Sequence, residues 1–212
     1  MQMTNSIEIG NMQWVPNYAL SFDGVDDYVG FSTSILPVGE KTLSLRVKIL
    51  SLDRGDAYFF GNKDSKTNLF YYNNNTELMI IGVGSVSTSL NLDTFYTIHF
   101  VYDGSNWEFF INGNLIGTFS GGDLSKDINR IGTYLNNKSY RYFNSQIIDE
   151  VRIWNTARTQ QEIQDNMNKE LTGNESGLVA YYKMDKGTGN TLIDYAGNNN
   201  GQIIGATWQE VE

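Results

Sequence analysis

Three carboxylates gathered in one short turn are the first residues that could do chemistry. Asp23 forms an Asp-Gly pair with Gly24, and Asp26 and Asp27 follow it. Such a cluster offers the hard oxygen ligands that calcium prefers. The net charge of −9 in 212 residues is compatible with a cation of this kind. The spacing differs from a self-sufficient calcium loop such as the EF-hand. The alternative is that these aspartates are ordinary turn residues.

A further carboxylate, Asp149, falls inside a strand pattern. Alternation over residues 147–154 places Asp149 on the same face as Val151 and Ile153, and Glu150 on the opposite face. A carboxylate among apolar side chains needs a cation or several hydrogen-bond donors. Backbone amides would satisfy it as well as a metal ion would.

An aromatic and amide-rich segment at residues 134–142 is the best candidate for ligand binding. It interleaves tyrosines with asparagines and two cations, and flat aromatic faces beside amides suit sugar rings and their hydroxyls. The alternative is that the tyrosines pack on neighbouring strands. The predicted ligand-binding residues are Tyr134, Asn136, Asn137, Tyr140, Arg141, Tyr142 and, from a second Tyr-Asn segment, Tyr72.

The composition excludes several other kinds of site. The chain has no cysteine and a single histidine, His99, which removes thiolate chemistry and the usual zinc triads. His99 sits in a strand pattern and is interpreted as a structural residue. The acidic balance argues against nucleic acid and against an anionic membrane surface. No stretch approaches ~20 apolar residues, so no membrane insertion is expected.

The elements that must position these residues are mostly strands. Period-two patterns cover residues 43–49, 95–102, 107–111 and 146–154, and shorter runs lie between them. Asp103-Gly104 and Asn112-Gly113 predict two consecutive hairpins. Thr159 and Glu162 predict a capped helix of about three turns, whose narrow apolar stripe favours packing at the edge of a sandwich.

These patterns predict an all-β chain with one domain at residues 17–212 and a leader or arm at residues 1–16. The leader has neither the basic nor the apolar segment of a signal peptide. Residues 178–208 either complete the sandwich or begin another repeat. Completion is favoured, because Leu178, Ala180, Tyr182 and Met184 would otherwise leave an apolar face uncovered.

Three segments together resemble one family. Residues 19–29 (ALSFDGVDDYV) resemble the opening strand and turn of laminin-G-like, concanavalin A-like jelly rolls, and residues 102–113 resemble the central hairpin of that family. Residues 148–158 (IDEVRIWNTAR), with residues 161–163 (QEI), resemble its "IDEVRIW" strand and short helix. The resemblance implies an antiparallel two-sheet jelly-roll sandwich with one short helix. It also implies a structural calcium shared by Asp23, Asp26 and Asp149.

The resemblance allows two classes of function. The first is a non-catalytic, lectin-like module that binds a cell-surface or extracellular polysaccharide in adhesion. The second is a block in a virion or surface assembly, such as a phage fibre or capsid decoration, that contacts other subunits. An enzyme is not expected, since glucanases of this fold place two carboxylates across a cleft, whereas alternation points Asp149 and Glu150 to opposite faces. Either function implies an extracellular, cell-surface or virion location.

Overall fold

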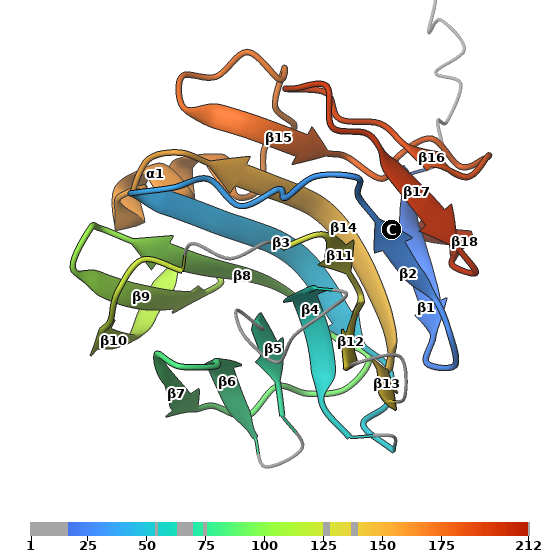
Figure 1. Cartoon of the computed structure of the whole chain (residues 1–212), viewed down its shortest axis with the longest axis horizontal. Coiled ribbons are helices and arrows are strands. Elements are labelled where there is room, and N and C mark those ends of the chain that lie inside the picture. The colour runs from blue at the N-terminus through green and yellow to red at the C-terminus, as the bar shows by residue number, and fades with distance from the viewer. Residues whose placement is uncertain are drawn as a thin grey trace, which may run out of the picture.

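A computed structural model describes residues 17–53, 55–62, 70–73, 76–124, 128–136 and 140–211, without the side chains of residues 135–142. The predicted leader at residues 1–16 therefore lies outside the described residues. Two large antiparallel sheets form the molecule (Figure 1). This confirms the predicted jelly-roll sandwich.

The first sheet has the strand order β10-β9-β8-β3-β14-β1-β18, and β15 also pairs with β14. Its bounds are β1 Asn17–Asp23, β3 Lys41–Ile49, β8 Phe95–Tyr102, β9 Asn106–Ile111, β10 Asn114–Ser120, β14 Ser145–Trp154, β15 Leu178–Tyr182 and β18 Thr207–Val211.

The second sheet has the order β16-β17-β2-β11-β4-β5-β6-β7, and β12 pairs with β13 as a separate hairpin. The bounds are β2 Tyr28–Gly30, β4 Ala57–Gly61, β5 Phe70–Tyr72, β6 Glu77–Ile80, β7 Gly84–Ser87, β11 Arg130–Ile131, β12 Thr133–Asn136, β13 Tyr140–Phe143, β16 Thr191–Leu192 and β17 Gly201–Ile204.

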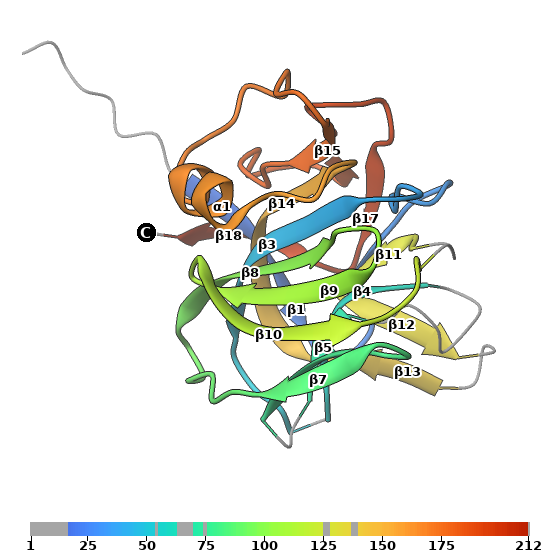
Figure 2. The ribbon, with the colours of Figure 1, turned by 90° about the vertical axis from the view of Figure 1, so that its left-hand side faces the viewer.

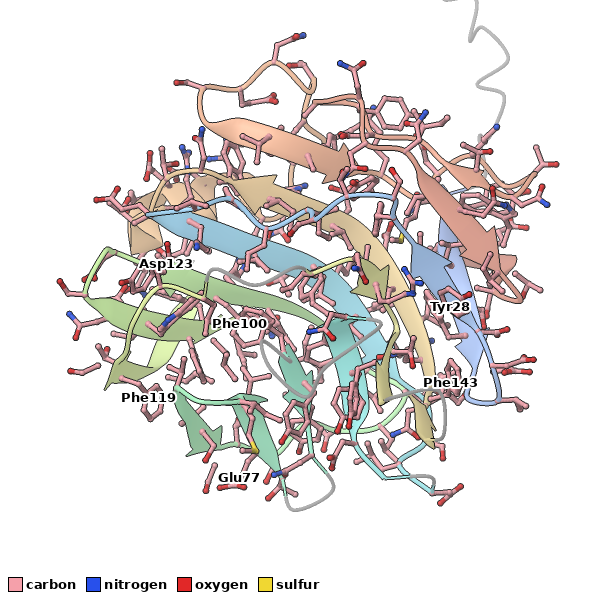
Figure 3. The ribbon with its side chains drawn as sticks, viewed as in Figure 1. Tyr28, Glu77, Phe100, Phe119, Asp123 and Phe143 are labelled. Carbon is pink, nitrogen blue, oxygen red and sulfur yellow. The ribbon has the colours of Figure 1, made fainter. Side chains whose placement is uncertain are left out.

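Aromatic side chains fill the space between the two sheets. Phe100 of β8 is fully buried (Figure 3). Its ring centroid lies 5.0 Å from that of Phe70 in the second sheet and 5.3 Å from that of Phe109. The edge-to-face geometry of these pairs is the arrangement that aromatic rings prefer. Phe100 and Phe109 alternate along their strands with Val101 and Phe110. Val101 and Phe110 therefore lie on the outer face of the first sheet, which is turned away from the second sheet.

Both predicted hairpins are present. Asn112 and Gly113 join β9 to β10 with φ angles of +49° and +73°, the backbone conformation that an Asn-Gly turn between twisted strands requires. Gly104 lies between β8 and β9 with φ of +97°. Turn chemistry therefore sets the register of this half of the first sheet.

The helix α1, Gln160–Asn166, covers the outer face of the first sheet (Figure 2). Its predicted capping box between Thr159 and Glu162 is confirmed. The helix is shorter than predicted, and it packs on a face of the sandwich, where Ile163 contacts Val101 and Phe110. As a result Ser44 on β3, which alternation places towards water, is buried.

The last 35 residues contribute strands to both sheets. β15 pairs with β14, β17 with β2, and β18 with β1. Tyr182, Met184 and Leu192 join the main core, each at most 1% exposed. In the part of the chain that the structure describes, no helix is long and apolar enough to cross a membrane.

Candidate functional site

A β-bulge in β14 determines which side chains reach the surface near its centre. Both Ile148 and Val151 belong to the core, although three positions separate them. The pairing with β3 shifts register between Asp149 and Arg152, and Glu150 has a φ of +50°. A bulge of this kind reverses the alternation and re-aims side chains. The prediction that Asp149 shares a face with Val151, and that Glu150 points the opposite way, is therefore wrong.

Because of the bulge, Asp149 and Glu150 line the same cleft. This cleft has a volume of about 580 Å³ and lies on the outer face of the first sheet, beside the end of α1. We call it the Glu150 cleft. Its floor is formed by Arg46, Thr97, Asp149, Glu150 and Arg152. Its rim includes Asn17, Asn168, Lys169, Glu170, Lys183 and Asp185.

Arg152 holds the floor of the Glu150 cleft in place. Its guanidinium bonds the Glu150 carboxylate through two nitrogens and also donates to the carbonyl oxygens of Asn166 and Lys169. Tyr181 adds a hydroxyl bond of 2.9 Å to the same carboxylate. Arg152 is buried, so this network fixes the segment after α1 to the sheet. Both nitrogens bond the same oxygen, Glu150 Oε2, and charge-assisted hydrogen bonds of this kind are stronger than neutral ones.

Asp149 lies deeper in the same floor. Its carboxylate accepts a 3.0 Å bond from Arg46 and a 2.9 Å bond from the Glu150 amide. Burial, followed by the charge of Glu150, raises the pKa of Asp149 to about 7 despite the opposing effect of Arg46. The cleft therefore contains a carboxyl group that titrates near neutral pH.

The predicted calcium ligands are brought together in part. Oxygens of Asp23, Asp26 and Asp27 lie within 4.8 Å of one another. Asp27 is buried and accepts a 2.7 Å bond from the Asp23 amide. Burial raises the pKa of Asp27, with further contributions from the charges of Asp23 and Asp26. We call residues 23–27 the Asp23 turn.

Asn144 has a buried side chain, and its backbone lies beside the Asp23 turn. Asn144 precedes Ser145, the register partner of Asp23, and its backbone is so close to Gly24 that a side chain there would clash. Asn144 is 1% exposed. Its Nδ2 donates to the Gly55 carbonyl, and its Oδ1 has no hydrogen-bond partner among the described residues. An unpaired buried carbonyl oxygen is costly, and oxygens of this type are calcium ligands. The donor set around the turn thus fits a calcium ion.

The structure does not bring Asp149 to this turn. Asp23 is opposite Ser145, so Asp149 lies four positions further along β14, roughly 13 Å away at ~3.3 Å per residue. One ion with ligand distances of about 2.4 Å cannot span that gap. Asp149 and the Asp23 turn therefore lie in two separate places and cannot share the single ion that the family resemblance had implied.

The predicted sugar-stacking tyrosines have mixed positions. Tyr134 is 2% exposed and packs against Tyr58, with ring centroids 5.2 Å apart. Tyr72 is 1% exposed, and its hydroxyl bonds the Thr88 carbonyl. Contrary to the prediction, neither ring presents a face to a ligand, because each is covered by neighbouring strands and loops. The backbones of Asn136, Tyr140, Arg141 and Tyr142 lie in the β12–β13 hairpin; their side chains and Asn137 lie outside the described residues.

His99 occupies the space between the first sheet and α1. It is buried, and burial together with the nearby Arg152 lowers its pKa to about 3. The imidazole is therefore neutral at physiological pH, as a structural residue would be.

Comparisons with known proteins agree with this architecture. The family model Laminin_G_3, described as the concanavalin A-like lectin/glucanases superfamily, matches residues 23–164. No curated protein sequence matches the chain.

Two solved structures share most of the fold. One is a Bacteroides ovatus protein provisionally described as carbohydrate binding, with 18% identity and a TM-score of 0.73. The match covers 94% of this chain but 61% of that protein, so the chain spans less than two thirds of its length. The other is a heptameric SAP-like pentraxin from Limulus polyphemus, with 16% identity, a TM-score of 0.60, and coverage of 94% and 97%.

Proposed function

The chain belongs to the concanavalin A-like lectin/glucanases superfamily, and from this premise we propose that it is a non-catalytic module that binds a cell-surface or extracellular polysaccharide. We place the binding site in the Glu150 cleft. The similarity to a carbohydrate-binding protein candidate supports the class of ligand, and the cleft supports the place.

The observation that carries this proposal is the fixed polar floor of the Glu150 cleft. Arg152 bonds Glu150 and two backbone carbonyls, and Glu150 also accepts from Tyr181, so their remaining donors and acceptors have set directions. Saccharide hydroxyls both donate and accept, and a preorganised polar surface binds them without first ordering its own side chains. A cleft of about 580 Å³ is within the usual size of small-ligand sites.

The geometry favours binding over hydrolysis. Glycosidases place two carboxylates on opposite sides of the scissile bond. Asp149 and Glu150 are consecutive residues on one wall, and each carboxylate is already engaged by an arginine. The bulge thus places both carboxylates in one cleft without setting them across a substrate.

We also propose that the Asp23 turn binds a structural calcium. The three clustered carboxylates and the orphaned Asn144 oxygen support this assignment. An ion there would join the start of β14 to the end of β1. It would also offset the burial and the repulsion from Asp23 and Asp26 that raise the pKa of Asp27.

A glycan array followed by calorimetry tests the function. Binding to a defined glycan should weaken on Glu150→Gln and on Asp185→Ala, which is exposed at the rim. The matched control Glu210→Gln changes an exposed carboxylate on β18 and should leave binding unchanged.

Tyr140→Ala separates the cleft from the β12–β13 hairpin. Loss of binding in Tyr140→Ala alone would move the site to the hairpin. A silent array together with stable oligomers would contradict glycan binding and favour the assembly function.

A further inference from the structure

The charges in the Glu150 cleft determine which saccharides it accepts, and this inference rests on the proposed glycan-binding function. We propose that the cleft selects neutral saccharides and discriminates against uronic and other acidic sugars. The proposal follows from the pairing of its ionic groups.

Three ion pairs occupy the cleft. Arg46 is paired with Asp149, Arg152 with Glu150, and Lys183 with Glu170. The six paired residues come from four segments of the chain, at positions 46, 149–152, 170 and 183, and these segments meet only in the folded state. Asp149 and Arg152 are buried, and Glu170 is 70% exposed at the rim.

The two remaining charged residues of the described lining are one of each sign. Lys169 is the cation, and Asp185 accepts a hydrogen bond of 3.3 Å from Tyr195. Above the pKa of Asp149, the four acidic and four basic side chains leave the cleft with no excess charge to attract an ion. A carboxylate ligand would meet four carboxylates of like sign. Three of the four cations would have to leave an existing ion pair to bind it, and the charge of the fourth, Lys169, is offset by Asp185 in the same lining.

A neutral hydroxyl needs no such exchange. An ionised carboxylate has about four acceptor sites and a guanidinium has five N–H donors, so each ion pair retains hydrogen-bonding capacity on its open side. A hydroxyl can donate to the carboxylate and accept from the cation of the same pair. Leaving a buried charge unpaired is far costlier than adding one neutral hydrogen bond. Discrimination against acidic sugars therefore results from ion pairs that already exist.

Calorimetric titration with matched ligands tests this inference. Neutral gluco- and manno-oligosaccharides would be compared with oligogalacturonates of the same length at about pH 8, where Asp149 is mostly ionised. The neutral series should bind at least about tenfold more tightly. Its affinity should change by less than about twofold between ~50 and ~500 mM salt, because no net ionic contact forms.

Asp185→Lys provides the sharper arm of the test. It replaces a negative charge at the rim by a positive one, a change of two charge units, and should raise oligogalacturonate affinity by about fivefold or more at low salt. Glu210→Lys makes the same charge change on β18, outside the cleft lining, and should produce a much smaller increase.

The outcomes separate this inference from the proposed function. Tighter binding of the acidic series by the wild-type protein, with loss on Glu150→Gln, would overturn the neutral preference and leave glycan binding at the cleft intact. An equal gain in Asp185→Lys and Glu210→Lys would also overturn it, since the rim charge would then have no local effect. Binding of neither series would overturn both.

Discussion

Leu192 provides the clearest test of whether the C-terminal strands belong to one cooperative unit with the rest of the chain. It lies in β16, is 1% exposed and belongs to the main core cluster. Truncating a buried leucine to alanine costs about 2–5 kcal/mol. In a chain of this size each kcal/mol lowers the melting temperature by about 2–4 °C, so Leu192→Ala should melt about 4–20 °C lower.

The assay is thermal unfolding followed by circular dichroism and by the fluorescence of tryptophans such as the buried Trp107. Ile204→Ala on the adjacent strand β17 is the control, because Ile204 is 37% exposed and its loss should cost about 1 kcal/mol or less. Both probes should report one transition. An early separate transition in Leu192→Ala, or an unchanged melting temperature, would refute the single-domain interpretation.

Three further perturbations test the site and its supports. Burial, and then the charge of Glu150, raises the pKa of Asp149 from 3.8 to about 7, so the folded state binds more protons than the unfolded state between these values. The contribution of this group to the free energy of unfolding is complete below about pH 4 and is lost as pH rises through about 7, by up to ~4 kcal/mol. Chemical denaturation should show this loss in the wild type and not in Asp149→Asn. If the Asp23 turn holds calcium, a chelator should lower the melting temperature of metal-loaded protein, because an ion that binds only the folded state stabilises it. Asp26→Asn should abolish that response. An unchanged melting curve would argue against the ion. Thr159→Ala removes the capping hydroxyl of α1 and should cost about 1 kcal/mol in urea unfolding, whereas no measurable cost would show that the capping box is dispensable.

Local sequence chemistry predicted the elements whose determinants lie close together in the chain. The Asn112-Gly113 turn, the Thr159 capping box and the alternation of β8 each depend on residues within a few positions of one another. The outer face of β3 was less predictable, because Ser44 is covered by a helix more than a hundred residues later in the chain. Alternation alone cannot tell solvent from a distant helix.

The Glu150 cleft could not be predicted from the sequence for a specific reason. A left-handed backbone at a glutamate has no signature in the sequence, since glycine is the usual residue there. Without that bulge, period-two alternation separates Asp149 from Glu150. The predicted exposure of the tyrosine rings was wrong for a related reason. A Tyr-Asn pattern is the same whether the ring faces water or, as with Tyr134, packs against a neighbouring ring.

Backbone NMR during titration with the best glycan from the array tests the central claim most directly. Binding in the Glu150 cleft predicts the largest amide shifts at Thr97, Glu150, Asn168 and Lys183, which come from four separate segments that line it. The same shifts should be lost in Asp185→Ala and retained in Glu210→Gln. Shifts confined to residues 133–143, with none in the cleft, would contradict the account and assign binding to the β12–β13 hairpin.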